Sequence, residues 1–332
     1  MPLRQRVIPL ALIIVATVIA APGALAQADS AGPAAEYPNR TVRFVVPIPP
    51  GGSADTVART VAQKLGDAWG QPVVVDNRAG ANGIIATELV AKSKPDGYTV
   101  LLALATHAIN PMLYPNLPYD SSRDFAPVTV LAEYPFGLVV HPSLPAGSVK
   151  ELIALARAKP AQLSYATSGT GSGPHLGIEL FKSMARIDLV HVPYRGAGPG
   201  LIDLIAGQVQ LSFTSLPASA PLIKAGKLRI LAVSSASRSP TVPELPSIAE
   251  TLPGFHVTGW LSLLAPAATP RAILAKLNAE TVKVLQLPDV KSKFSGEGLN
   301  VVGNTSQQFA EFLAAETSKW AKVIKTAGVR LD

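Results

Sequence analysis

Two glycine-rich turns in this sequence bring together backbone N–H groups that suit an anion. The first, residues 47–59, follows a strand-like apolar run and leads into an amphipathic, helix-like run at 56–69. A strand, a turn and a helix start leave several N–H groups free at one point, at the positive end of the helix dipole. Such a corner suits a carboxylate. The alternative is an ordinary turn in which Gly51 and Gly52 reverse the chain and Asp55 caps the helix.

The second turn, residues 168–175, alternates glycine with serine and threonine between a strand-like run at 163–167 and a helix-like run at 176–184. Its amides and hydroxyls suit a carboxylate or a phosphate. The alternative is a flexible turn with a capping hydroxyl. Its glycines lack the G-x-G-x-x-G spacing of dinucleotide sites, and no acid follows on the next strand where that fingerprint needs one. We therefore expect no dinucleotide cofactor.

Three arginines near these turns and strand ends each allow two interpretations. Arg195 follows a strand and either forms a bidentate pair with a carboxylate or lies on the surface. Arg78 lies with Asn82 on another strand-end loop and has the same two options. Arg59 stands four residues after Asp55, so an ion pair on the helix surface explains both residues without a ligand.

Catalytic and metal-binding patterns are missing from the sequence. The five histidines show no H-E-x-x-H or other close ligand spacing. The chain has no cysteine, which excludes a thiol nucleophile and a cysteine-based zinc site. There is no G-x-S-x-G elbow, although a Ser–His pair assembled in space stays open. We predict no catalytic residue, no metal and no cofactor.

The N-terminus predicts export. Arg4 and Arg6 precede an uncharged run over 7–21, which is followed by a Pro-Gly break and by Ala24-Leu-Ala26. These are the basic, apolar and small-residue parts of a signal peptide. A membrane anchor is the alternative, but a spanning helix needs roughly 20 uninterrupted apolar residues. We predict a signal peptide over 1–26, cleaved after Ala26, and a disordered stretch over 27–36.

Length and composition predict two globular domains. A chain of 332 residues with 48% hydrophobic and 15% charged residues is long enough for two α/β domains with cores of their own. The formal net charge of +7 falls by two when the leader is removed. Lysine and arginine are scattered without a basic run, so we expect no nucleic-acid binding and a mild attraction for small anions.

Strand-like and helix-like runs alternate along the chain and form two series. The expected strands are 41–46, 72–76, 98–105, 136–141, 163–167, 189–194, 210–215, 229–234 and 257–264. Their continuous apolar character indicates a mostly parallel sheet covered by helices on both faces. We predict two lobes, 37–137 with 261–332 and 138–260, joined by the strands at 136–141 and 257–264. The C-terminal helices are expected to pack on the first lobe, and a ligand cleft is expected between the lobes.

Seven short motifs in a fixed order give the chain a family resemblance. They are Pro49-Pro-Gly-Gly-x-x-Asp55-x-x-Ala-Arg59, Asn77-Arg-x-Gly-x-x-Gly83, Pro95-Asp-Gly-Tyr98, Leu117-Pro-Tyr-Asp120, Tyr165-Ala-x-Ser-Gly-x-Gly-Ser172, His191-Val-Pro-Tyr-Arg-Gly196 and Ala225-Gly-Lys-Leu-Arg229. The chain resembles the Bug (TctC-like) family, the extracytoplasmic solute receptors of tripartite tricarboxylate transporters. The likeness runs from Tyr37 to the end, and the seven motifs together are specific although each alone is weak.

The resemblance implies a two-lobed periplasmic-binding-protein fold of type II-like form, with a two-strand hinge. Such a receptor closes over a small carboxylate: a di- or tricarboxylate, an acidic amino acid or an aromatic acid. It is expected in the periplasm, as a monomer without covalent chemistry. Its partner would be a membrane permease of one large and one small subunit. A ligand sensor for a signalling system, and a secreted hydrolase dependent on Ser168, are the alternatives.

The resemblance also implies which residues bind the ligand. Loop 49–55 would hold one carboxylate through backbone amides and ordered water, and loop 167–172 would form the opposite wall. The expected ligand-binding residues are Pro49, Pro50, Gly51, Gly52, Asp55, Thr106, His107, Asn110, Thr167, Ser168, Gly169, Thr170, Gly171, His175, Tyr194, Arg195, Gly196 and Ser215. Gly52→Val is expected to abolish binding and leave the fold intact. One departure from the family pattern, Pro246-Ser-Ile-Ala-Glu250, is expected to alter the rim of the cleft.

Overall fold

The computed structural model describes residues 36–51 and 53–330 of the chain. Within them no helix has the length and apolar content needed to cross a membrane. The elements in chain order are β1 (Val42–Val46), α1 (Ser53–Trp69), β2 (Val73–Asn77), η1 (Ala81–Gly83), α2 (Ile84–Ala91), β3 (Thr99–Leu104), α3 (Thr106–Leu113), β4 (Phe125–Val140), α4 (Val149–Ala158), β5 (Ser164–Thr167), α5 (Gly173–Ala185), β6 (Val190–Pro193), α6 (Ala197–Ile205), β7 (Leu211–Ser215), α7 (Leu216–Lys224), β8 (Arg229–Val233), η2 (Ile248–Glu250), β9 (Thr258–Pro266), α8 (Arg271–Gln286), α9 (Pro288–Gly296), β10 (Asn300–Val301) and α10 (Ser306–Ala327).

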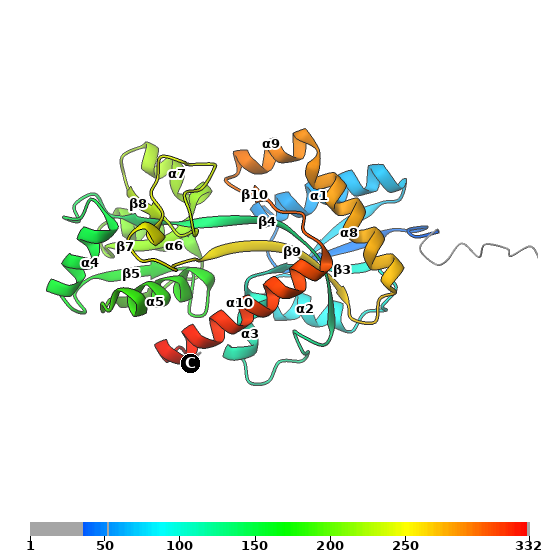
Figure 1. The fold of residues 1–332 in the computed structure, drawn as a ribbon, viewed down its shortest axis with the longest axis horizontal. Coiled ribbons are helices and arrows are strands. Elements are labelled where there is room, and N and C mark those ends of the chain that lie inside the picture. Colours follow the sequence, from blue (N-terminus) through cyan, green and yellow to red (C-terminus); the bar gives the residue numbers. More distant parts are fainter. Residues whose placement is uncertain (1–35, 52, 331–332) are drawn as a thin grey trace, which may run out of the picture.

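Two lobes lie side by side and are joined by two long strands. In Figure 1, β4 and β9 run through the middle of the molecule, between a lobe that holds α4 to α7 and a lobe that holds α1 to α3, α8 and α9. The strand order is β2-β1-β3-β9-β4-β7-β5-β6, and β8 and β10 also pair with β4. Strands β1 to β3 are parallel, as are β5 to β7, while β4 and β9 run antiparallel to their neighbours. The predicted two-lobed α/β fold is confirmed.

Strand β4 is much longer than the sequence predicted, because two prolines disguise it. It pairs with β9 from Phe125 to Pro135 and with β7 and β8 from Phe136 onward. Proline removes a ladder hydrogen bond and therefore argues against a central strand. Here the register shifts beside Pro127, and Pro135 stands where β4 changes partners. Both prolines thus lie where the ladder is already irregular, and the strand continues through both of them.

The second crossing lies just before β9. In the part of the chain that the structure describes, β9 pairs with β3 and β4 and with no other strand. The chain therefore passes between the lobes just before β9 begins, at Val257–Thr258. The first crossing, at Pro135–Phe136 of β4, lies close to the predicted limit at 137. Assignment of 37–137 with 261–332 to one lobe and 138–260 to the other stays a prediction.

A buried serine fastens the two crossing strands together where they enter the second lobe. The Ser234 hydroxyl accepts the Phe136 N–H at 2.8 Å and donates to the Val257 carbonyl at 2.6 Å. The Ser234 N–H donates to the Phe136 carbonyl, and its own carbonyl accepts the Val257 N–H, both at 2.9 Å. Since Ser234 is fully buried, water cannot replace these bonds.

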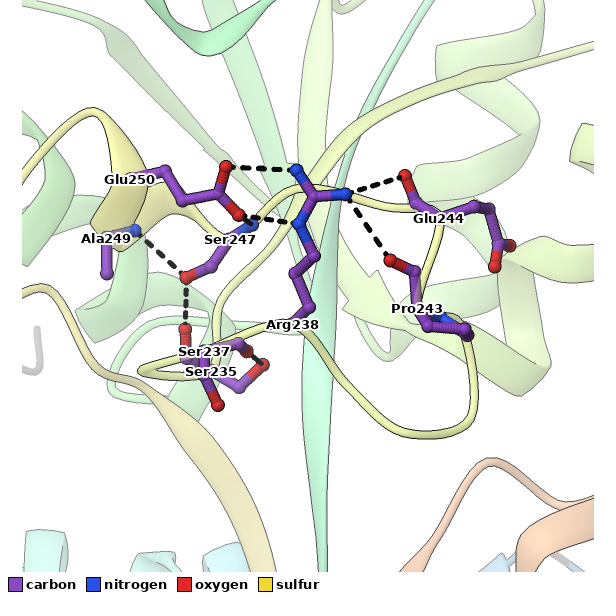
Figure 2. A network of polar contacts seen from close by, with 8 residues as sticks. All are labelled: Ser235, Ser237, Arg238, Pro243, Glu244, Ser247, Ala249 and Glu250. Carbon is purple, nitrogen blue, oxygen red and sulfur yellow. Dashed lines mark hydrogen bonds and ion pairs between the residues drawn. The ribbon is translucent and has the colours of Figure 1, made fainter.

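The connection from β8 to β9 is held by one arginine. Figure 2 shows the Arg238 guanidinium between the Glu250 carboxylate and two carbonyls, those of Pro243 and Glu244. Ser247 caps the short helix η2 and forms a capping box with Glu250. The hydrogen bond from Arg238, followed by that from the Ser247 N–H, lowers the pKa of Glu250. This network fixes the course of a proline-rich segment that has no strand of its own.

The C-terminal helices cover both lobes. Helix α8 packs on α1 and β4, as predicted for the first lobe. Helix α10 packs on α3 and β4, and it also packs on α5 of the second lobe, a contact that the sequence did not predict. Buried Glu316 accepts the indole N–H groups of Trp260 at 3.3 Å and Trp320 at 3.0 Å, which ties α10 to β9. A capping box of Thr305 and Gln308 opens this helix.

Replacement of Ser234 by alanine tests the fastening of the crossing strands. It leaves the buried Phe136 N–H without its acceptor, and we expect a loss of about 1–3 kcal/mol in the free energy of unfolding. Urea unfolding followed by circular dichroism measures it. Ser237→Ala, in the exposed part of the same connection, is the control and should change stability by less than about 0.5 kcal/mol. Equal losses in the two variants would contradict the role given to Ser234.

Candidate functional site

A cavity of about 310 Å³ lies between the two lobes. It is lined by Asn82, Leu104, Ala105, Thr106, Tyr134, Phe136, Ala166, Thr167, Ser168, Ser172, Gly173, Pro174, Ala197, Gly200, Ser212, Phe213, Thr214, Ser215 and Gly259. A second cavity, of about 260 Å³, is lined by Ile48, Ser53, Ala54, Leu104, Tyr134, Ser215, Leu261 and Leu299. The two share Leu104, Tyr134 and Ser215, so they adjoin. Together they form the cleft.

Helix starts converge on this cleft. The first cavity is lined by the first residues of α3, α5 and α6 and by the residue that precedes α7. The second cavity is lined by the first residues of α1. A helix start presents unpaired N–H groups and the positive end of the dipole. None of the described residues that line either cavity carries a charged side chain. The cleft therefore offers an anion neutral donors alone.

The turn before α5 supplies one wall of the first cavity. Ser172 caps α5: its hydroxyl accepts the His175 N–H at 3.3 Å and donates to the Gly169 carbonyl at 2.7 Å. Of the residues predicted here, Thr167 and Ser168 line the cavity, while Gly169, Thr170 and Gly171 form the turn behind them. The hydroxyl of Thr167 is hydrogen-bonded to His191 Nε2 at 2.7 Å. This wall is thus held from behind by side-chain contacts.

The turn before α1 reaches the cleft through its ends. Ile48, Ser53 and Ala54 line the second cavity, whereas Pro49, Pro50 and Gly51 lie exposed beside them. The Gly51 N–H donates to Asp55 Oδ2 at 3.1 Å, so this amide is not free for a ligand as predicted. Gly52 lies outside the described residues. Ser53 is the residue of this turn that the structure puts at the cavity.

Asp55 holds the turn in place and does not line either cavity. Its buried carboxylate also accepts hydrogen bonds from Asn77 and from Arg59, both at 2.9 Å. Burial raises the pKa of Asp55, but the hydrogen bonds from Arg59, Asn77 and Gly51 outweigh burial, and the net pKa is lowered. Asp55 therefore fixes the turn by accepting the Gly51 N–H, and the expected ion pair between Asp55 and Arg59 forms.

Two predicted residues of α3 have other roles. His107 is buried on the far side, where Nε2 contacts the Ser121 carbonyl at 3.1 Å, and it lines a separate cavity beside α10. It does not belong to the cleft because α3 turns its ring away from Thr106. Asn110 is buried behind the wall: its amide donates to the Asn82 carbonyl, and its Oδ1 accepts from Asn82 Nδ2, both at 3.1 Å. Asn110 thus holds Asn82, which lines the cavity in a left-handed conformation.

The remaining predicted residues lie near the cavity without lining it. His175 is buried behind the turn, and the Tyr194 hydroxyl donates to Asp203 at 2.6 Å. Arg195 is exposed, with no ion pair to another described residue. Gly196 precedes α6, whose residues Ala197 and Gly200 do line the cavity. The carboxylate pair predicted for Arg195 is therefore not supported by its position.

Several lining residues escaped the sequence analysis. Thr214 is buried and its hydroxyl has no hydrogen-bond partner among the described residues. Ser212 and Thr214 alternate along β7, and this period of two was a usable signal for hydroxyls on one face. Tyr134 is different: its ring lies against Gly259, where an added Cβ would meet it at 2.2 Å. No local pattern predicts such a contact between two crossing strands.

Two α/β lobes joined by two crossing strands, with a cleft of neutral donors between them, define the class of solute-binding proteins. The family model described as "Tripartite tricarboxylate transporter family receptor" matches residues 57–329. The chain belongs to this family, the TctC family. No group of three or more potential metal ligands occurs in the part of the chain that the structure describes.

Solved structures of related proteins agree with this assignment. "R. palustris Rpa4515 with adipate" is 41% identical, with a TM-score of 0.79, and the match covers 89% of this chain and all of that one. The periplasmic binding protein BugD is 32% identical, with a TM-score of 0.75, over 89% of this chain and all of that one. MatC of Rhodopseudomonas palustris, with bound malate, is 33% identical, with a TM-score of 0.74, and the match covers 87% of this chain and all of that one. Two of these neighbours hold a small dicarboxylate, and the third is a periplasmic binding protein.

Replacement of Asp55 by alanine tests its role in holding the turn. It removes the carboxylate that accepts hydrogen bonds from the Gly51 N–H, the Asn77 amide and Arg59, so we expect a loss of about 1–3 kcal/mol in the free energy of unfolding at neutral pH. Because the folded pKa of Asp55 is lowered, its contribution is present above the ordinary pKa and is lost as the pH falls through the folded value. The difference from wild type should therefore shrink in acid.

Chemical denaturation at several pH values measures this difference. Asp67→Ala is the matched control, since Asp67 is an exposed carboxylate on the same helix. It should cost less than about 0.5 kcal/mol. A loss for Asp55→Ala that is small, or that stays constant into acid, would show that the carboxylate does not hold the turn.

Proposed function

We propose that this protein is a periplasmic receptor for a small organic dicarboxylate, which it delivers to a tripartite-type membrane permease. The observation that carries the proposal is the form of the cleft. Two cavities, each at helix starts, adjoin at Leu104 and Tyr134. Two anion positions separated by a largely apolar contact suit a molecule with a carboxylate at each end.

The neutral lining decides how the carboxylates would be held. N–H and hydroxyl donors to an ionised group form hydrogen bonds roughly twice as strong as those between neutral groups. Because no charged side chain lines the cleft, these donors need no buried counter-ion that would lose its own hydration in the closed state. Donors at helix starts, with Ser168 and Thr214, fit one carboxylate in the first cavity. Ser53 and the start of α1 fit the other.

The related structures support the same ligand class. The neighbour with 41% identity holds adipate, an aliphatic diacid with a carboxylate at each end of the molecule. The neighbour with 33% identity holds malate, a shorter diacid. The neighbour of higher identity holds the six-carbon diacid, and this favours adipate-like ligands here.

Lobe closure is the proposed mechanism. The lobes are joined at two strand crossings, and the residues that line the cavity come from both sides of these crossings. Closure would remove water from the cleft and strengthen each hydrogen bond to the carboxylates. The closed, monomeric receptor would then present its ligand to a permease of one large and one small subunit, the partner that the family implies.

Calorimetry with a matched ligand panel tests the proposal. We expect adipate to bind, and monomethyl adipate to bind at least about tenfold more weakly, because one charge-assisted set of hydrogen bonds contributes about 1.5–3 kcal/mol. Adipamide, which has the same length and no charge, should not bind measurably. Tight binding of adipamide, or of a neutral sugar in place of every carboxylate, would contradict a dicarboxylate receptor.

Thr214→Val tests whether the unpartnered hydroxyl serves the ligand. Since that hydroxyl has no partner among the described residues, its removal should not destabilise the fold. Affinity for adipate should fall about 3- to 10-fold, the effect of one hydrogen bond of about 0.5–1.5 kcal/mol. Thr281→Val is the matched control, because Thr281 is equally buried and unpartnered but lies on α8, away from the cleft. Identical affinities for the two variants would exclude Thr214 from binding.

A further inference from the structure

Three rings are stacked behind the turn that forms one wall of the cleft. Tyr165 stacks on His191 with ring centroids 5.0 Å apart, and His191 stacks on His175 with centroids 3.9 Å apart and planes inclined by 14°. Tyr165 belongs to β5, His191 to β6 and His175 to α5. The stack therefore joins the three elements that surround the turn.

Each histidine of the stack holds one point of the turn. His191 Nε2 is hydrogen-bonded to the hydroxyl of Thr167, which lines the cavity, at 2.7 Å. His175 Nδ1 accepts the N–H of Gly171 at 3.1 Å. Gly171 has a φ of +76°, which glycine adopts without strain, and this bond fixes the turn at that left-handed residue.

These contacts define the protonation state that the turn needs. Because the Gly171 N–H donates to Nδ1 of His175, this nitrogen has to be unprotonated. A proton on Nδ1 would turn the attraction into repulsion between two N–H groups. The Thr167 hydroxyl can donate or accept, so its contact with His191 tolerates either tautomer. If both rings were protonated, two cations would face each other at 3.9 Å.

Burial, more than the charged groups around the stack, keeps the two histidines neutral. Glu179 accepts hydrogen bonds from the Tyr165 hydroxyl at 2.5 Å and from Lys182 at 2.9 Å, and Asp188 lies 3.9 Å from the same lysine. Burial, then His191 and Lys182, lower the pKa of His175 to about 3. Burial also lowers the pKa of His191, against the opposing effect of Glu179. Both rings are thus neutral in the folded protein at physiological pH.

We propose that His175 and His191 are positioning residues that hold the cleft turn in its binding conformation and make ligand release responsive to acid. The inference rests on the proposed function, because it concerns the same cleft. In neutral medium the stack keeps Thr167 and the residues after it in place. In acid the two histidines take up protons once their rings are no longer stacked. Acid therefore favours this released form of the turn over the stacked form.

Proton linkage sets the size of the effect. His175 has a folded pKa of about 3, below its ordinary value, so the stacked turn is stabilised above the ordinary pKa and loses this advantage as the pH falls. For a released imidazole with a pKa near 6.5, release becomes roughly 30-fold more favourable at pH 5.0 than at pH 7.5. The dissociation constant for a carboxylate probe should rise by up to about this factor.

Isosteric variants separate the stack from other effects of pH. The double variant His175→Asn, His191→Gln keeps an acceptor near each original nitrogen and cannot take up a proton. Calorimetry with adipate at pH 7.5 and pH 5.0 gives the ratio of the two dissociation constants. Protonation of adipate itself is common to all proteins and cancels between them. We expect the ratio to be at least about fivefold larger in wild type than in the double variant.

His141→Asn is the control, since His141 lies at the end of β4 and does not line the cleft. It should keep the wild-type ratio. Equal ratios in wild type and double variant, with adipate bound at pH 7.5, would overturn the inference and leave the proposed function standing. Absence of binding by any carboxylate at pH 7.5 would instead overturn the proposed function.

A measurement without ligand tests the stack independently. In NMR titrations of the unliganded protein from pH 8 to pH 5, the ring signals of His175 and His191 should change together from neutral to protonated imidazole, at a pH below the ordinary pKa of histidine, because only the released turn takes up the protons. The amide signal of Gly171 should move in acid in wild type and stay in place in the double variant. Ordinary titration of His175 near pH 6.5, with an unchanged Gly171 signal, would contradict the proposed role of the stack.

Discussion

An anion site built from neutral donors needs those donors to be held in place, because no charged group compensates for a misplaced one. This constraint explains much of the structure. Helices that begin at the carboxyl ends of parallel strands point their N–H groups toward one edge of the sheet. In this chain α3, α5 and α6 begin at the first cavity and α1 at the second. The alternation of strand and helix is thus also the arrangement that makes the cleft electropositive without lysine or arginine.

Buried polar side chains behind the cleft hold these donors. Asp55 fixes the turn before α1, Asn110 fixes Asn82, and the histidine stack fixes the turn before α5. Asp55, Asn110 and the two histidines do not themselves line the cavities. A network behind a binding site costs stability when it is only partly satisfied, and this favours the complete hydrogen bonding seen around Asp55. Ser234 likewise holds the segments of β4 and β9 where the chain crosses between the lobes. Lobes that close on a ligand need these crossings to keep a fixed register.

Much of the fold could be predicted from sequence, and less of the site. Apolar runs separated by turns predicted the strands. Strand β4 was underestimated because Pro127 and Pro135 are ordinarily incompatible with a central strand. The family motifs pointed to loops that contribute residues to the two cavities, but a motif does not say which side of a loop faces a cavity. His107 and Thr106 are neighbours in sequence, yet the helix places only Thr106 at the cavity.

The central claim is that neutral donors of both lobes hold the two ends of one diacid. A crystal structure of the protein grown with adipate tests it most directly. We predict one carboxylate at the starts of α5 and α6, beside Ser172 and Ala197, and the other at the start of α1, beside Ser53. Neither carboxylate should form a salt bridge. Adipate paired with an arginine or lysine, or bound outside the cleft between the lobes, would contradict the account.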